Sequence, residues 1–152
     1  MYFVDRNQIE ETLDEMSRLL DIFNEKNEWN TALEKLALER LVQVLIEALI
    51  DVGNQMIDGF IMRDPGSYED IVDILIDEAV VPKSSEAGLK AVIRERKTLV
   101  QNYRHINHNR LIDILQQYHT VWEAFPNAVR SFLEKELGPV SAFKPLQGED
   151  SR

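Results

Sequence analysis

The sequence has 152 residues, of which 27 are acidic and 17 basic, a formal net charge of −10 and no cysteine. This length suits one domain, and the lack of cysteine excludes disulfides, thiolate metal ligands and a cysteine nucleophile. The net charge argues against a protein that coats nucleic acid or anionic membranes by bulk attraction. No apolar run is long enough to span a membrane and no signal-peptide pattern opens the chain, so we expect a cytoplasmic protein.

The spacing of apolar residues predicts helix along nearly the whole chain. A first helix is expected at roughly residues 5–27, where apolar side chains recur every three or four positions. A second, long helix begins at a capping-box pattern formed by Thr31 and Glu34 and ends at the turn Pro65-Gly66. Its apolar residues cover more than one face, which indicates that it packs against more than one neighbour.

The remaining elements are also predicted to be helical. A third, shorter helix is capped by Ser67 and ends before Val81-Pro82. A fourth is expected over residues 86–106 and a fifth over residues 109–138, with Pro126 kinking or breaking the fifth because proline removes a backbone donor. Alternating strand patterns are absent, so the sequence predicts one all-α bundle.

Charge is unevenly distributed along the chain. Residues 86–110 carry six basic and two acidic side chains, a net charge of +4 inside an acidic protein. Two interpretations stay open. These cations either form exposed and individually weak ion pairs with acidic neighbours, or they form a focused site for a phosphate backbone or a nucleotide.

A short motif lies within this basic segment. Arg96-Lys-Thr-Leu-Val-Gln101-Asn-Tyr103 resembles the R-x4-H-x-Y motif of the HepT-like branch of HEPN domains, with glutamine at the histidine position. Two further stretches resemble the same family: the second helix from Leu38 to Asn54, and a P-x-S-Y segment from Asp64 to Val81. The resemblance covers about residues 1–143. Within the family, the chain most resembles the group typified by YutE of Bacillus.

The resemblance implies a fold and an activity. It implies an all-α, up-down helical bundle of about five helices at residues 1–143, followed by a flexible C-terminal tail at residues 144–152. Proteins of this family are homodimers whose two motifs meet in a cleft between protomers. Active members are metal-independent endoribonucleases, the toxins of type VII toxin–antitoxin systems. Their partner is a minimal nucleotidyltransferase (MNT) antitoxin, which transfers AMP from ATP to the motif tyrosine. We therefore expect a homodimer, an MNT antitoxin and RNA as partners, with no cofactor, no metal and no membrane.

The resemblance also gives roles to three residues. Arg96 falls at the motif arginine, Gln101 at the catalytic histidine and Tyr103 at the tyrosine that receives AMP. Metal-free RNA cleavage needs one group that takes a proton from the 2′-hydroxyl and one that stabilises charge on the phosphate. Arginine suits the second task, but the amide of glutamine takes no proton near neutral pH. We therefore expect ribonuclease activity to be weak or lost.

Other basic and aromatic residues of the segment are candidates for binding RNA or a nucleotide, namely Arg94, Lys97, Arg104 and His105. His105 would lie one turn beyond Gln101 on the same face of a continuous helix, where it could replace the missing base. His108 is a second candidate. The alternative is that both histidines are exposed or capping side chains.

The second helix carries a polar ridge formed by Glu47, Asp51, Asn54 and Asp58. This ridge either faces solvent or lines a cleft opposite the motif, and in the second case Asp51 and Asn54 would contact RNA or a nucleotide. No Glu-x-x-His pair completes a carboxylate metal site. Three functions stay open: a toxin ribonuclease, a catalytically degenerate regulator that binds RNA, a nucleotide or a partner, and a purely structural helical dimer.

Overall fold

The computed structural model describes residues 3–139, and the expected tail at residues 144–152 lies outside them. Within the described part all regular structure is helical, and no helix there is long and apolar enough to cross a membrane. The elements in chain order are α1 (Arg6–Glu25), α2 (Ala32–Gly59), α3 (Tyr68–Asp77), η1 (Lys83–Ser85), α4 (Glu86–Ile93), α5 (Arg96–Val100), η2 (Tyr103–His105), α6 (His108–Gln117) and α7 (His119–Leu137).

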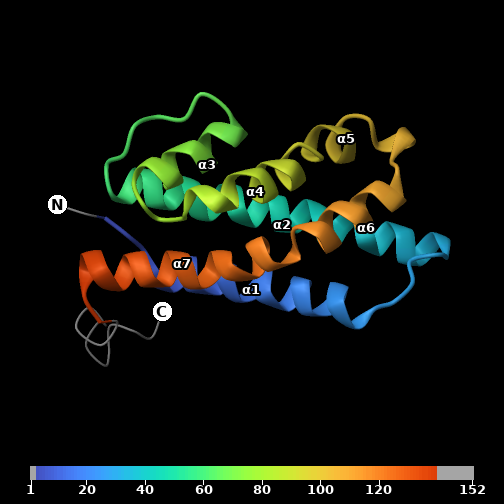
Figure 1. The fold of residues 1–152 in the computed structure, drawn as a ribbon, viewed down its shortest axis with the longest axis horizontal. Helices are drawn as coiled ribbons and strands as arrows, with labels where there is room; N and C mark the ends of the chain where they lie inside the picture. The colour runs from blue at the N-terminus through green and yellow to red at the C-terminus, as the bar shows by residue number, and fades with distance from the viewer. Residues whose placement is uncertain (1–2, 140–152) are drawn as a thin grey trace.

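Three long helices give the bundle its length (Figure 1). α1 packs against both α2 and α7, while α3 and α4 pack on each other and on α2. The short helices α5 and α6 lie toward one end of the molecule, where each contacts α2. The core is made of buried apolar side chains from all the long helices, and the indole Nε1 of the buried Trp122 donates to the Gly88 carbonyl oxygen (3.0 Å).

Side-chain caps fix where several helices begin. The capping box expected at Thr31 and Glu34 is present in both directions, and the Ser67 hydroxyl accepts from the backbone N–H of Asp70 (3.1 Å) at the start of α3. These bonds satisfy backbone donors that a helix leaves free in its first turn. The predicted starts of these two helices are therefore confirmed.

A glycine allows α3 to approach α2 closely. A Cβ on Gly53 of α2 would lie 2.3 Å from Cγ2 of Ile71 in α3. No real Cβ tolerates such a contact, so the distance between these helices depends on the missing side chain. This contact brings the first turn of α3 next to the polar ridge of α2.

The fourth expected helix is wrong as a continuous element. The chain turns at Arg94 and Glu95, and residues 86–106 form α4, α5 and η2 instead. Both turn residues keep right-handed helical backbone angles, so the apolar stripe continues across the break and gives no sign of it. The buried Glu95 accepts a hydrogen bond from Nε of Arg110 at the start of α6 (3.1 Å), which fixes the turn from outside.

The fifth expected helix is also divided. The break lies at Tyr118, between α6 and α7, whereas α7 runs without interruption through Pro126. Of the two outcomes expected at Pro126, a kink or a break, the break is therefore wrong. Tyr118 packs on Gly88 of α4, where a Cβ would lie 3.0 Å from the tyrosine ring. The described part of the chain thus has more and shorter helices than the five expected.

Candidate functional site

The motif arginine lies in the first turn of α5 and faces α2 and α3. Its Nε donates to Oε1 of Glu47 in α2 (2.8 Å), and its guanidinium carbon lies 4.6 Å from the centre of the Tyr68 ring. Among residues 3–139 Arg96 makes no other hydrogen bond or ion pair. Glu47 and Tyr68 therefore orient the guanidinium while its two terminal nitrogens stay available for a ligand.

A hollow of about 540 Å³ opens beside this arginine. We name it the motif hollow, and its lining residues are Ser67, Tyr68, Glu69, Ile93, Arg94, Arg96, Lys97 and Gln101. α5 begins directly after the turn at Glu95 and contacts α2, while Arg96 in its first turn contacts Tyr68 of α3. Four candidates predicted from the sequence thus meet in one place: Arg94, Arg96, Lys97 and Gln101.

The motif glutamine and tyrosine lie at the end of α5. Gln101 follows the last residue of the helix and is exposed. Tyr103 opens η2 and 65% of its surface is exposed, so another protein can reach its ring. Asn102 between them leaves the helical conformation, with φ −106° and ψ 39°.

One of the two histidine candidates, His105, does not lie where the sequence interpretation placed it. Because α5 ends at Val100, His105 in η2 does not follow Gln101 on one continuous helix, and the expected shared face is wrong. His105 is exposed. His108 is half-buried, with its Nε2 2.7 Å from Oε2 of Glu39 in α2. Neither residue lines the motif hollow.

The residues of the polar ridge of α2 have different surroundings. Glu47 holds Arg96 through an ion pair, so this ridge residue contacts the motif arginine. Asp51, one turn further, is exposed, and partial burial together with the neighbouring Glu47 carboxylate raises the pKa of Asp51. Asp58 is exposed at the far end of the helix.

A second hollow, of about 360 Å³, lies beside the fourth ridge residue. We name it the Asn54 hollow, and its lining residues are Asn54, Pro65, Gly66, Ser67, Tyr68 and Ile71. The Asn54 side chain is exposed and makes no hydrogen bond within the described residues. Sequence reasoning assigned no role to Tyr68, which lines both hollows, although the P-x-S-Y resemblance contained it.

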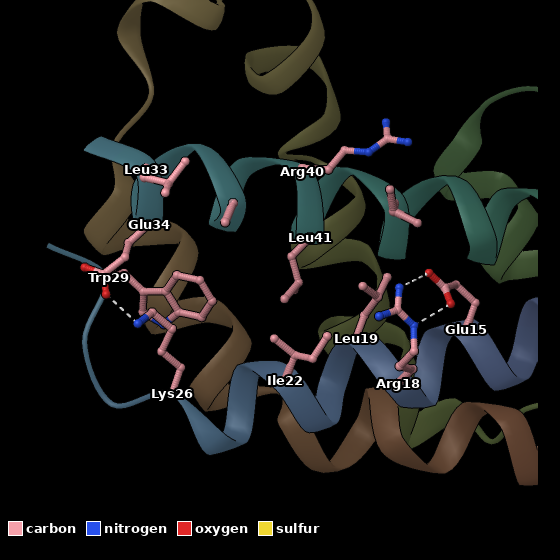
Figure 2. Close-up of a pocket in the computed structure, with 12 residues that line it drawn as sticks. Glu15, Arg18, Leu19, Ile22, Lys26, Trp29, Leu33, Glu34, Arg40 and Leu41 are labelled. Carbon is pink, nitrogen blue, oxygen red and sulfur yellow. Dashed lines mark hydrogen bonds and ion pairs between the residues drawn. The ribbon is translucent and has the colours of Figure 1, made fainter. Parts of the chain in front are cut away.

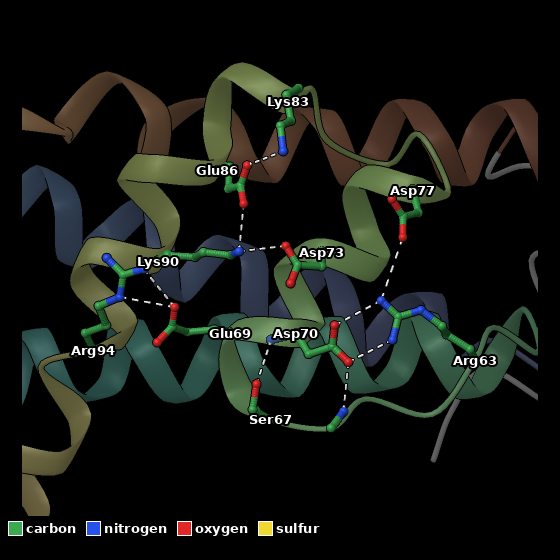
Figure 3. A network of polar contacts seen from close by, with 11 residues as sticks. Arg63, Ser67, Glu69, Asp70, Asp73, Asp77, Lys83, Glu86, Lys90 and Arg94 are labelled. Carbon is green, nitrogen blue, oxygen red and sulfur yellow. Dashed lines mark hydrogen bonds and ion pairs between the residues drawn. The ribbon is translucent and has the colours of Figure 1, made fainter.

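Most cations of the basic segment are paired with acids. Lys90 contacts Asp73 (2.6 Å) and Glu86 (2.7 Å), and Arg94 contacts Glu69 (2.9 Å), as Figure 3 shows. Arg96 and Arg110 are also paired, through Glu47 and Glu95. Among residues 3–139, the exposed Lys97 and Arg104 are the only two of the six cations without an ion pair. Ion pairing therefore accounts for most cations of this segment. The cations that remain for a focused positive site lie in the α5–η2 region.

An apolar groove of about 620 Å³ lies between α1 and the first half of α2 (Figure 2). Apolar side chains such as Ile22, Trp29 and Leu33 line it, and Leu33 is 77% exposed. Charged residues of both signs form its edges, and an ion pair between Lys26 and Glu34 lies at the end beside Trp29. The second helix was expected to pack on more than one neighbour, and this is confirmed, because α2 contacts α1, α3, α4, α5 and α6. The groove is an apolar part of its surface that the described chain leaves open.

Within the described residues, no group of three or more histidine or acidic side chains is placed to hold a metal ion. The polar groups that line the motif hollow include a guanidinium with two available nitrogens, an ammonium, an amide and a phenol ring. The paired side chains of Arg94 and Glu69 and the Ser67 hydroxyl complete them. Such a set binds an anion and orients it but contains no imidazole.

Comparisons with known proteins place these features in context. Residues 9–129 match the profile of the family described as Ribonuclease HepT-like. YutE of Bacillus subtilis (strain 168), named as a candidate RNase, is 50% identical over 144 residues, covering 95% of this chain and 100% of that protein. A solved structure of YutE, described as a cytosolic protein of unknown function, superposes with a TM-score of 0.90 and covers 94% of this chain and 100% of its own.

Two solved toxin–antitoxin structures share the fold at 16% sequence identity. A toxin–antitoxin with AMP-PNP superposes with a TM-score of 0.73, covering 81% of this chain and 97% of that chain. A tri-AMPylated HEPN toxin of Shewanella oneidensis, in complex with an MNT antitoxin, gives a TM-score of 0.71 and covers 81% and 96%. At this level of identity the likeness shows a common fold.

Proposed function

This chain belongs to the HepT-like ribonuclease family, and from that premise we propose that it is the toxin of an MNT/HepT-type pair that acts on RNA without a metal. The observation that carries the proposal is that the Arg96 side chain is held in place but not fully hydrogen-bonded. Glu47 and Tyr68 hold it in place, yet its two terminal nitrogens remain available beside the motif hollow. That is the arrangement expected of a preorganised phosphate ligand.

Different residues of the motif hollow contribute to binding and to cleavage. In metal-free cleavage the ribose 2′-hydroxyl loses its proton to a base such as water and attacks the neighbouring phosphorus, and negative charge grows on the phosphate oxygens. The bond from phosphorus to the 5′-oxygen then breaks, and that oxygen takes up a proton. Arg96 stabilises this charge through its two free N–H-bearing nitrogens, and the exposed Lys97 adds a second cation. Gln101 can orient the phosphate or a water but takes no proton. With no histidine lining the hollow, cleavage is slow, because general base catalysis typically contributes about 10²–10⁴-fold.

The antitoxin acts on Tyr103. Its exposed position at the end of α5 suits a residue that must enter the active site of another enzyme. AMP groups attached there add bulk and negative charge next to Gln101 and Lys97, and both effects repel RNA. Support comes from the structural relatives, one of which is a tri-AMPylated toxin bound to an MNT antitoxin.

The proposal includes a homodimer. The face of α2 that carries Glu47 also carries Leu33, Arg40 and Val44, which recur at helical spacing and line the apolar groove. A two-fold contact along this face would cover the groove and bring two motif hollows toward one cleft. Edges that carry both signs of charge suit such a self-complementary contact. Light scattering of Leu33→Glu should then report a smaller species than the wild type, whereas Ile61→Glu, a change at another exposed apolar residue, should have no effect.

Intact-mass spectrometry tests the toxin assignment. The chain is co-expressed with an MNT-type nucleotidyltransferase from the same genome, with Tyr103→Phe as the matched variant. We expect one or more AMP adducts on the wild type, none on Tyr103→Phe, and weaker RNA binding by the modified protein. Unmodified wild-type protein, or adducts that persist in Tyr103→Phe, would contradict the role given to Tyr103.

One observation favours a second candidate function. Because residue 101 is glutamine, the motif lacks its histidine, the one motif residue that titrates near neutral pH. None of the residues that line the hollow is a histidine. A chain that binds RNA at Arg96 without cutting it would be a catalytically degenerate regulator. RNA binding without measurable cleavage, in the wild type and in Gln101→His alike, would identify this function.

A further inference from the structure

The ring of Tyr68 stands between two hollows of different chemical character. On one side the motif hollow is lined by three cationic side chains, whereas the lining of the Asn54 hollow carries no charged side chain. Tyr68 contributes to both linings, is 45% exposed and lies against the guanidinium of Arg96. A charged group and a neutral planar group of one ligand could therefore occupy the two hollows with the tyrosine between them.

The wall of the Asn54 hollow is held in a fixed shape. Oδ2 of Asp70 accepts from the backbone N–H of Gly66 (2.8 Å) and from Nη1 of Arg63 (2.8 Å), while Oδ1 accepts from Nη2 of the same arginine (2.9 Å), as Figure 3 shows for the Arg63–Asp70 pair. The Ser67 hydroxyl closes the turn by capping α3. These bonds fix the segment that leads to Tyr68, so the hollow is formed before any ligand arrives.

Asn54 supplies a polar side chain in this lining that is not committed to another group of the described chain. Its amide makes no hydrogen bond within residues 3–139, and it lies on a rigid helix. An amide presents a donor and an acceptor side by side, which matches the edge of a nucleobase. The other side chains of the lining offer an aromatic ring, a proline ring and an isoleucine, which suit an uncharged planar group.

We propose that the Asn54 hollow is a nucleobase subsite, which binds an unpaired base of single-stranded RNA next to the phosphate on Arg96. The inference rests on the proposed function, because it takes the motif hollow as the phosphate site. Recognition of RNA generally uses splayed bases, aromatic rings and hydrogen bonds to base edges. Tyr68 then serves both sites: it supports the guanidinium on one side and borders the base on the other.

The test separates the base from the backbone. Full-length protein is titrated by fluorescence anisotropy with a short single-stranded 2′-O-methyl RNA and with an abasic oligomer that has the same sugar–phosphate backbone. Neither probe has the hydroxyl that cleavage would use. The variants are Asn54→Ala, Tyr68→Leu and Arg96→Ala. Asn24→Ala is the control because Asn24 is also an exposed helical asparagine without a hydrogen bond in the described chain.

The expected pattern is specific. Asn54→Ala should weaken binding of the intact RNA about fivefold and leave the abasic oligomer unchanged, as the loss of one hydrogen bond to the base requires. Tyr68→Leu should weaken the intact RNA by about fivefold or more and the abasic oligomer less. Asn24→Ala should bind both probes like the wild type.

Two results would overturn the inference in different ways. If Arg96→Ala weakens both probes while Asn54→Ala changes neither, or changes both equally, the phosphate site stands and the base subsite is wrong. If Arg96→Ala leaves both probes unaffected, the phosphate site fails as well, and the proposed function fails with it.

Discussion

Cations in two neighbouring regions of this molecule differ in whether they contact carboxylates. On the α3–α4 face Arg63, Lys83, Lys90 and Arg94 each contact at least one carboxylate, and Figure 3 shows these contacts together. In the α5–η2 region Lys97 and Arg104 contact none within residues 3–139, and Arg96 uses one nitrogen of three.

The difference separates charges that support the fold from charges that can bind a ligand. Exposed ion pairs join α3 to α4, although each is worth little on its own. Among the six cations of residues 86–110, the two without an ion pair in the described chain, Lys97 and Arg104, lie within or directly beside the family motif. A net charge counted along the sequence cannot make this distinction, because several of the acidic partners, among them Glu47, Glu69 and Asp73, come from other helices.

The largest expected effect comes from returning a histidine to the α5–η2 region. Gln101→His should raise the rate of RNA cleavage by about 10²–10⁴-fold, because it supplies a group that takes a proton near neutral pH. Adding Arg96→Ala should remove the gain, since proton transfer and phosphate stabilisation act on one transition state. Cleavage of a fluorogenic RNA measures both.

A different base would change this outcome in a recognisable way. If the exposed His105 already takes the proton, the wild type will cleave RNA and His105→Ala will abolish the activity. Strong wild-type cleavage that survives the loss of both His105 and His108 would contradict the roles given to the motif.

An intermediate effect is expected from Arg96 itself. Arg96→Ala should weaken RNA binding about tenfold or more, because hydrogen bonds from a charged donor contribute more than neutral ones. Lys135→Ala provides the control, since Lys135 is exposed on α7 and has no ion pair in the described chain. Equal losses in the two variants, measured by anisotropy, would mean that RNA responds to net charge and that no localised site exists.

The smallest effect concerns the paired face. Lys83 and then Lys90 lower the pKa of Glu86 to about 2. An unfolded glutamate titrates near 4.5, so the stability that ionised Glu86 contributes is present above about pH 4.5 and is lost as the pH falls toward 2. Thermal melts should place Glu86→Gln about 3 °C or less below the wild type at pH 6. A difference in melting temperature between the two proteins that stays constant down to pH 2 would exclude the titration of Glu86 as its cause.

The helices with strong local signals could be predicted from the sequence. The apolar stripe of α1 and the caps at Thr31 and Ser67 are encoded within a few residues, and the structure has them where the pattern indicates. The breaks at Glu95 and Tyr118 have no such signal. They depend on Arg110 and Gly88, which come from other helices. Glu95 keeps helical backbone angles, so the apolar stripe runs through that break, whereas Tyr118 departs from them with φ −109° and ψ 17°.

The candidate site could be predicted only in part. The motif located Arg96, and the basic segment located Lys97, because identity and spacing suffice for both. The role of Glu47 was one of two open interpretations, and Tyr68 was missed as a partner of Arg96. Both depend on how α2, α3 and α5 meet, and the close approach at Gly53 and the turn at Glu95 decide that geometry.

Two lysines seven residues apart provide the most direct measurement. Lys90→Gln and Lys97→Gln remove the same charge, one from the paired face and one from the α5–η2 region. For Lys97→Gln we predict an unchanged melting temperature and a salt dependence of RNA binding, log K against log salt, that is shallower by about 0.7, as the loss of one phosphate contact requires. Lys90→Gln should lower the melting temperature and leave the salt dependence unchanged. Identical behaviour of the two variants, or the reverse pattern, would contradict the division between paired and ligand-binding cations.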